Sequence, residues 1–200
     1  MNAEFAQLDT IDWAILGVLQ GDASLPVHEV GALPGSKEIY FCMKRIYGRD
    51  MHHVIRERER DEAVGKASRW TLRRLVEAFR DVCRATAFAH SKGVIHRDLK
   101  PANVMLREDN SPVLIDFGLA RRAEDDGSTT GVGKVLGSPF YMSPEQAQAQ
   151  PIDARTDIYS LGVMFYEMLT GARPYLGRTA MAIMTQHTHS PVPKLPPELA

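Results

Sequence analysis

The stretch "VIHRDLKPANVML", residues 94–106, places acidic, basic and carboxamide side chains in a short polar run between apolar residues. Asp98 and Asn103 are five positions apart, and Pro101 between them disfavours a regular helix. Asp116 follows in "LIDFG", where a nearby glycine allows an unusual backbone conformation. We therefore expect a polar site built on loops next to short strands.

These residue types suit the transfer of a phosphoryl group from a nucleotide. Such a reaction needs a carboxylate that orients the attacking hydroxyl and accepts its proton, and oxygen ligands for a Mg²⁺ that bridges the phosphates. Asp98 suits the first role, and Asn103 and Asp116 suit the second. Lys100 is placed to neutralise charge on the phosphoryl group. Each aspartate alone is more typical of a turn, so the prediction depends on the joint pattern.

The joint pattern resembles protein kinases of the serine/threonine type. His96-Arg97-Asp98-Leu99, Asn103 and Asp116-Phe117-Gly118 match the signatures of their catalytic and metal-binding loops. "SPE" at 143–145 stands where that family has Ala-Pro-Glu. Together with "GSPFYMSPEQ" and "RTDIYSLGVMFYEMLTGARPY", these motifs are most similar to the eukaryotic-like kinases of bacteria. The resemblance covers roughly residues 5–195.

The resemblance implies a role for each matching residue. Asp98 would be the catalytic base, Lys100 a catalytic lysine that contacts phosphate, and Asn103 and Asp116 the metal ligands. Met43 would be the gatekeeper beside the adenine, and Met105 would form the floor under it; without the resemblance both are ordinary core methionines. The residues implied to contact Mg-ATP are Met43, Lys44, Ile46, Lys100, Asn103, Met105 and Asp116.

Other positions concern the support and control of the site. The resemblance implies that Asp157 hydrogen-bonds the backbone of the catalytic loop, whereas its position alone suits a helix N-cap. Arg97 implies control by a phosphorylated activation segment, and Ser138 is expected to contact Asp98 and Lys100. The resemblance is also compatible with a dimer formed through that segment. The candidate phosphorylation sites are Ser128, Thr129 and Thr130.

The expected fold is α+β and protein kinase-like, mainly the helical large lobe with a partial small lobe made of the regulatory helix and two strands. Residues 1–47 would form the partial small lobe and hinge, and residues 48–200 the large lobe with its catalytic loop, activation segment and central helix. Apolar periodicity predicts helices at 5–20 and 70–93. A strongly apolar run predicts a central helix at 157–170. Strands are expected on both sides of "PGSK" and within "NVMLR" and "PVLIDFG".

The amino-acid composition bears on which kinds of binding partner the protein has. The 24 basic and 25 acidic side chains give a net charge of −1, which offers no general attraction to nucleic acid or to an anionic membrane. No apolar run approaches the ~18 residues that a membrane span requires, and the first residues do not resemble a secretory signal. Cys42 and Cys83 lie in apolar runs and are expected to be reduced. These features predict a cytoplasmic protein.

The sequence lacks two parts that a protein kinase normally uses, a glycine-rich loop over the phosphates and a strand lysine paired with a helix glutamate. We therefore expect a catalytic domain that is incomplete at both ends, is poorly soluble alone and transfers phosphate slowly. The expected function is transfer of the ATP γ-phosphate to Ser or Thr hydroxyls of proteins. A pseudokinase-like binding module without phosphotransfer is the alternative, and a small-molecule phosphotransferase is disfavoured by the "SPE" segment.

Overall fold

The computed structural model describes residues 27–32, 39–43, 46–117 and 138–197. These residues fall into two compact units, one within residues 1–47 and the other within residues 48–200. The predicted helix at 5–20 lies outside the described residues, as do Lys44 and the phosphorylation candidates Ser128, Thr129 and Thr130.

The first unit contains a pair of antiparallel strands, β1 (Val27–Ala32) and β2 (Ile39–Met43). Val30 lies opposite Phe41, and the register shifts between Val27 and Glu29. The predicted pair of strands is therefore confirmed. Its sequence basis is the proline-glycine breaker between two runs of β-branched and aromatic residues.

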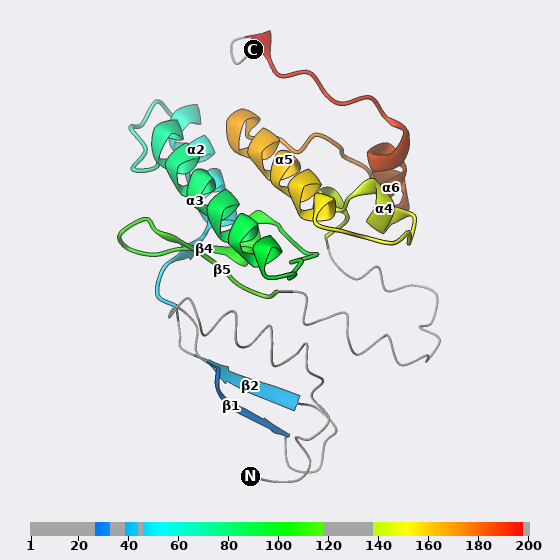
Figure 1. Ribbon diagram of the computed structural model, residues 1–200. Coiled ribbons are helices and arrows are strands. Elements are labelled where there is room, and N and C mark those ends of the chain that lie inside the picture. The colour runs from blue at the N-terminus through cyan, green and yellow to red at the C-terminus, as the bar shows by residue number, and fades with distance from the viewer. Residues whose placement is uncertain (1–26, 33–38, 44–45, 118–137, 198–200) are drawn as a thin grey trace. The chain divides into compact units, whose positions relative to one another are not determined.

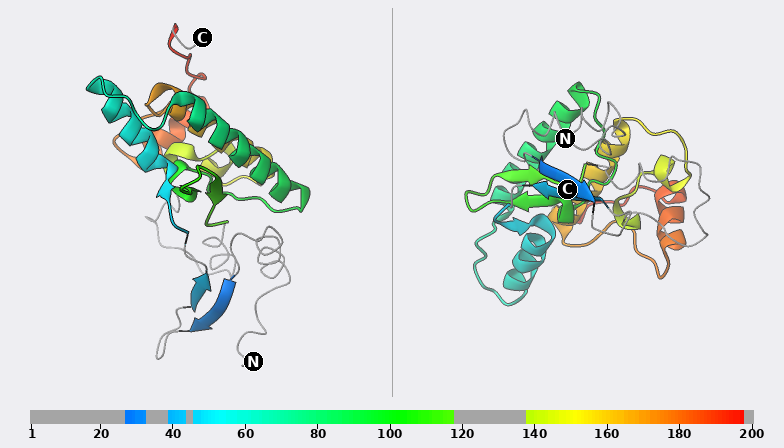
Figure 2. Two further views of the ribbon diagram at one scale, coloured as in Figure 1. Left: turned by 90° about the vertical axis from the view of Figure 1, so that its left-hand side faces the viewer. Right: turned by 90° about the horizontal axis from the view of Figure 1, so that it is seen from below.

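The second unit contains a small antiparallel sheet with the order β3 (Arg49–Asp50), β4 (Val104–Leu106) and β5 (Pro112–Leu114) (Figure 2). The strands β4 and β5 were predicted, whereas β3 was not. Gly48 directly precedes β3, and its backbone passes very close to that of Leu106. A Cβ atom added at Gly48 would overlap the Leu106 carbonyl oxygen. Glycine is therefore required at position 48 for β3 to reach its place in the sheet.

Two long helices, α3 (Leu72–Ser91) and α5 (Arg155–Thr170), pack side by side in the second unit (Figure 1). The Thr71 side chain caps the start of α3, and Gly93 follows its end with a φ of 73°. Phe79 of α3 stacks on Phe165 of α5 with ring centroids 5.0 Å apart. Both predicted helices are confirmed, and each buries apolar side chains. The buried residues that α3 and α5 contribute include Leu75, Val82, Leu161, Met164 and Met168.

The remaining elements were not predicted from the sequence. They are the helices α2 (Met51–Ala63), α4 (Pro144–Ala147) and α6 (Ala180–His189), and the short 3₁₀ turns η2 (Pro101–Asn103) and η4 (Pro139–Tyr141). Asp50 caps α2 by accepting a hydrogen bond from the backbone of His53, and Thr179 caps α6 in the same way. The unit is mainly helical with antiparallel strands, so the predicted α+β class is confirmed.

Within the described ranges, none of the helices combines the length and the apolar character that crossing a bilayer would require.

Candidate functional site

Asp98 is the centre of a compact polar cluster in the second unit. Its Oδ2 accepts hydrogen bonds from Lys100 Nζ at 2.6 Å and from Asn103 Nδ2 at 3.2 Å, and Asn103 Nδ2 also donates to the Asp98 carbonyl at 2.9 Å. The turn η2 makes this possible because it folds Asn103 back over Asp98. Among the described residues nothing donates to the other carboxylate oxygen, Oδ1, which leaves it available to a substrate.

Asp116 lies at the same end of the small sheet as Asn103. Since β4 and β5 are antiparallel with Val104 opposite Leu114, the residue before β4 and the residues after β5 meet, and Ile115 N donates to Asn103 O at 3.0 Å. Asp116 is exposed and has an unusual φ of 59°. Its carboxylate forms no hydrogen bond with any described residue. The predicted metal ligands Asn103 and Asp116 thus lie at the same end of the sheet.

The oxygen ligands at this end of the sheet fit a hard divalent cation. Asn103 uses its amide nitrogen on Asp98, so its carboxamide oxygen remains without a donor among the described residues. This oxygen and the Asp116 carboxylate are the kind of ligand that Mg²⁺ prefers. The described part of the chain holds no group of three or more His, Cys, Asp or Glu side chains that could bind a metal. The Asn103 carboxamide oxygen and the Asp116 carboxylate would hold such a cation.

Asp157 anchors the backbone just before Asp98. Its carboxylate is fully buried; Oδ2 accepts from His96 N at 2.8 Å and Oδ1 accepts from Arg97 N at 2.9 Å, while His90 Nε2 lies 2.7 Å from Oδ2. The N-cap of α5 is Ala154 and not Asp157. The predicted contact between Asp157 and the catalytic-loop backbone is confirmed, and the N-cap interpretation is excluded.

His96 links the Asp98 loop to the segment that carries Asp116. Its ring is buried, Nε2 lies 3.0 Å from the Ile115 carbonyl, and Nδ1 accepts a long hydrogen bond of 3.4 Å from Asp98 N. Burial lowers the pKa of His96 more than the charge of Asp157 and the Ile115 carbonyl raise it. The ring is therefore neutral, with the proton on Nε2, and its ring centroid is 4.5 Å from that of Phe117.

The "SPE" segment is tied to the start of α5. Thr156 Oγ1 donates to Glu145 Oε1 at 2.6 Å and lies 3.1 Å from Ser143 Oγ. Burial raises the pKa of Glu145, but hydrogen bonds from Thr156, from the Glu145 backbone and from Ser143 together outweigh it, so the pKa is lowered overall. Ser138, in contrast, does not form the predicted link: within the described residues, no hydrogen bond joins its side chain to Asp98 or Lys100.

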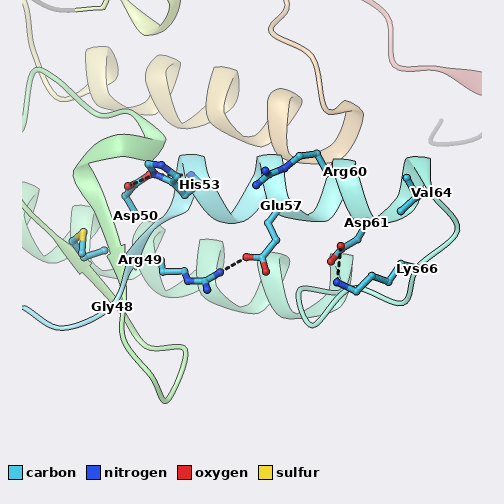
Figure 3. Close-up of a pocket in the computed structure, with 10 residues that line it drawn as sticks. Gly48, Arg49, Asp50, His53, Glu57, Arg60, Asp61, Val64 and Lys66 are labelled. Carbon is cyan, nitrogen blue, oxygen red and sulfur yellow. Dashed lines mark hydrogen bonds and ion pairs between the residues drawn. The ribbon is translucent and has the colours of Figure 1, made fainter.

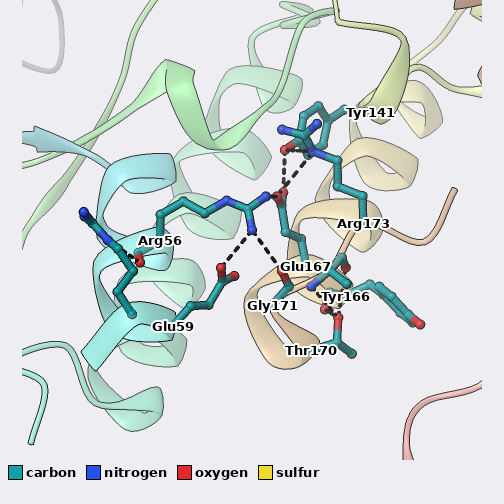
Figure 4. A network of polar contacts seen from close by, with 10 residues as sticks. Arg56, Glu59, Tyr141, Tyr166, Glu167, Thr170, Gly171 and Arg173 are labelled. Carbon is teal, nitrogen blue, oxygen red and sulfur yellow. Dashed lines mark hydrogen bonds and ion pairs between the residues drawn. The ribbon is translucent and has the colours of Figure 1, made fainter. Parts of the chain in front are cut away.

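A second buried network, which sequence reasoning missed, holds the turn η4 (Figure 4). The Glu167 carboxylate, on α5, is 2% exposed and accepts a short hydrogen bond from the hydroxyl of Tyr141. It also pairs with Arg173 at 3.3 Å and with Arg56 of α2 at 3.4 Å. The Arg173 guanidinium lies 4.0 Å from the centroid of the Phe140 ring. The network joins α2, η4 and α5 through residues that are more than a hundred positions apart.

The predicted adenine contacts are divided between the two units. Met43 is the last residue of β2 and Ile46 is half-buried, both in the first unit, while Met105 lies on β4 in the second. Lys44 lies outside the described residues. A joint role of these four residues at ATP therefore stays a prediction.

Met105 also lines an open groove of about 820 Å³ that runs along α2 (Figure 3). The acidic side chains of the groove already have partners: Glu57 pairs with Arg49, Asp50 with His53 at 2.6 Å, and Asp61 with Lys66 at 3.1 Å. Asp98, Asn103 and Asp116 are not among its lining residues. The groove is thus separate from the Asp98 cluster, whose residues are the candidates for chemistry.

Several known proteins are similar in sequence to this chain. The chain is 46% identical over 123 residues to the serine/threonine-protein kinase PknB of Mycolicibacterium smegmatis, a match that covers 60% of this chain and 20% of that protein. PknB of Mycobacterium tuberculosis is 44% identical over 125 residues, which is 62% of this chain and 20% of that protein. The probable serine/threonine-protein kinase CA_C1728 of Clostridium acetobutylicum is 36% identical over 161 residues, covering 80% and 23%.

The matched region is about a fifth of the length of these curated relatives. The protein kinase domain profile matches residues 26–196, which include the Asp98 cluster, the "SPE" segment and all described helices. The chain therefore belongs to the protein kinase domain family.

Proposed function

We propose that this chain is part of a serine/threonine protein kinase that transfers the γ-phosphate of ATP to Ser or Thr hydroxyls of proteins. One observation carries the proposal: Asp98 is held by Lys100 and Asn103 on one carboxylate oxygen, while its other oxygen has no donor among the described residues. The kinase names of the bacterial relatives support the same conclusion. No comparison favours the alternative of a binding module without phosphotransfer.

The geometry of the cluster supports a separate task for each of its residues. Asp98 Oδ1 accepts the proton of the substrate hydroxyl as the hydroxyl oxygen bonds to the γ-phosphorus, and the bond from that phosphorus to the β–γ bridging oxygen breaks. Lys100 fixes the orientation of the carboxylate and brings a positive charge to the site of transfer. Asn103 and Asp116 would hold Mg²⁺, which neutralises charge on the phosphates when bound.

Further assignments belong to the same proposal. Residues 1–47 would be a partial small lobe with the hinge, and residues 48–200 the large lobe. Met43, Lys44, Ile46 and Met105 would surround the adenine. The location would be cytoplasmic, in line with the free thiol of Cys83, and a dimer would form through the activation segment.

The direct test compares the chain with its Asp98→Asn variant in a transfer assay with labelled ATP, Mg²⁺ and a generic protein substrate. We expect slow but measurable transfer, because the sequence has no glycine-rich loop, and a further loss of about 10²–10⁴-fold in the variant. Asp109→Asn is the matched control. It makes the same chemical change at an exposed turn residue that accepts hydrogen bonds from Ser111.

The outcomes separate the two functional hypotheses. Equal transfer by the chain and the Asp98→Asn variant would refute the role of Asp98 as base. Binding of ATP with no transfer above background would favour the binding module.

A further inference from the structure

Gln146 makes a contact that connects two segments of the candidate site. It lies in α4, directly after the "SPE" segment, where its Oε1 accepts a hydrogen bond from Ser143 N at 3.0 Å. Its Nε2 donates to the carbonyl oxygen of Arg97 at 2.7 Å, although the two residues are 49 positions apart. Gln146 thus joins the end of the activation segment to the peptide that carries Asp98.

Only a carboxamide of this length can make both contacts. The backbone N–H of Ser143 needs an acceptor, and the Arg97 carbonyl needs a donor. A glutamate could serve only Ser143, a lysine only Arg97, and a methionine neither. The amide orientation is fixed by these two partners, since the reverse orientation would place donor against donor and acceptor against acceptor.

The Arg97 contact stabilises an unusual backbone conformation. Arg97 has a φ of 70°, in the left-handed region that a non-glycine residue adopts rarely. Such a conformation persists only where the surroundings hold it. Here Asp157 Oδ1 accepts from the Arg97 N–H at 2.9 Å, and Gln146 donates to the Arg97 carbonyl. That carbonyl belongs to the Arg97–Asp98 peptide, so its orientation determines where the Asp98 side chain points.

We propose that Gln146 is a positioning residue for the catalytic base: its carboxamide holds the Arg97–Asp98 peptide when α4 is in place and so makes the geometry of Asp98 depend on the end of the activation segment. The role rests on the proposed kinase function. Gln146 forms no hydrogen bond with Asp98 or Lys100, and it acts through the backbone of Arg97.

The test compares Gln146→Glu with Gln150→Glu in the whole chain. Gln146→Glu keeps the acceptor for Ser143 N but replaces the donor to Arg97 with a carboxylate oxygen that repels the carbonyl. Gln150→Glu makes the same change at an exposed residue just beyond α4, whose side chain bonds to no described residue. The readouts are the thermal midpoint, hydrogen exchange of the amides of residues 96–99, and phosphoryl transfer from Mg-ATP.

We expect Gln146→Glu to leave the thermal midpoint close to that of the wild type, because the hydrogen bond to Arg97 is exposed to solvent. Amide exchange at residues 97 and 98 should become faster. The turnover rate should fall by about tenfold to a hundredfold with the KM for ATP unchanged, since a displaced base affects the chemical step and not nucleotide binding. Gln146→Met should show the same changes and also lower the thermal midpoint, because it loses both contacts.

Exchange in Gln146→Glu that equals exchange in Gln150→Glu would overturn the proposal, and so would a loss of transfer without any change in exchange. If the wild-type chain binds ATP but transfers no phosphate, the proposed kinase function fails. In that case the exchange comparison still decides whether Gln146 holds the Arg97–Asp98 peptide.

Discussion

At the scale of single residues, the Asp157 carboxylate is the strongest constraint on the loop that carries Asp98. The carboxylate is fully buried, accepts hydrogen bonds from the backbone N–H groups of His96 and Arg97, and contacts the His90 ring. Asp157→Asn exchanges one acceptor oxygen for an NH₂ group that faces a donor. We expect the free energy of unfolding to fall by about 1–3 kcal/mol, the cost of one unsatisfied buried donor.

Urea unfolding followed by circular dichroism measures this loss for Asp157→Asn. Asp153→Asn is the control, because Asp153 is exposed and its carboxylate bonds, among the described residues, only to nearby Arg155. The control should change the unfolding midpoint little. An unaltered midpoint in Asp157→Asn would show that the loop backbone finds other partners.

The residues of the Asp98 cluster could be predicted from the sequence because their spacing is local. Asp98, Lys100 and Asn103 lie within six positions, and the contacts among them follow from one turn. The partners of Asp157, Gln146 and Glu167 are different, because each joins segments that only the tertiary fold brings together. Resemblance to the family predicted the Asp157 contact. Nothing in the local pattern indicated Gln146 or Glu167, since a glutamine after a proline-glutamate pair and a glutamate in an apolar helix have many ordinary roles.

At the scale of elements, two glycines have opposite requirements. An added Cβ at Gly48 would meet the Leu106 carbonyl carbon at 2.9 Å, whereas at Gly162, on the exposed face of α5, it would meet nothing within 4 Å. Gly48→Ala should therefore separate β3 from β4 and cost about 1–3 kcal/mol. Gly162→Ala should stabilise α5 by about 0.5–1 kcal/mol, because alanine loses less backbone entropy in a helix.

Each alanine variant serves as the control for the other when both are unfolded in urea under the same conditions. Opposite shifts of the midpoint are expected. A Gly48→Ala midpoint at or above that of the wild type would show that the crossing of residues 48 and 106 does not set the position of β3.

The buried Glu167 network predicts a coupling between η4 and the segment after α5. Burial and the charge of Glu167 raise the pKa of Tyr141, so its hydroxyl stays protonated and donates to Glu167. Arg173→Met removes one of the two cations beside a buried carboxylate. The cost should stay below the about 3–5 kcal/mol expected for a fully unpaired buried charge, because Arg56 remains.

A double-mutant cycle with Tyr141→Phe measures how strongly the two groups interact through Glu167. We expect a coupling energy of about 0.5–3 kcal/mol, as is usual for residues in one hydrogen-bond network. Arg178→Met, at an exposed arginine five positions further on, is the control. Additive effects of Arg173→Met and Tyr141→Phe would mean that they hold η4 independently.

The elements that sequence analysis missed have weak apolar periodicity. In α2, only Met51, Val54 and Ile55 are buried, and charged residues fill the rest of the helix, where Arg58 bonds to Glu62. In α6, only Ile183 and His187 are buried, so the apolar stripe is too short to detect. Capping residues before both helices, Asp50 and Thr179, were the available signal. The long helices α3 and α5 were predictable because each contains many apolar residues, several of which are buried.

At the scale of the whole molecule, two buried histidines make stability depend on pH. Burial lowers the pKa of His96 and of His187. For His187, this effect is larger than the opposite influence of the nearby backbone of Pro139 and Phe140. His187 Nδ1 lies 2.7 Å from the Tyr159 hydroxyl, and its Nε2 is buried without a partner among the described residues. Both rings are neutral in the folded chain and can take up a proton once the chain unfolds.

This difference fixes the sign of the pH dependence. Below the pKa of about 6.5 of an unfolded histidine, the unfolded chain binds more protons than the folded one, so acidification favours unfolding. The free energy of unfolding should be nearly constant above about pH 7 and fall below about pH 6.5, by at most about 1.4 kcal/mol per pH unit for each histidine.

His187→Asn should reduce the slope of the free energy of unfolding against pH between pH 7 and pH 5, because it removes one such group, while asparagine can keep a hydrogen bond to Tyr159. His189→Asn, at an exposed position of the same helix, is the matched control. Urea midpoints measured between pH 7 and pH 5 give this slope for each variant. A slope for His187→Asn as steep as that for His189→Asn would show that His187 is protonated without loss of the fold.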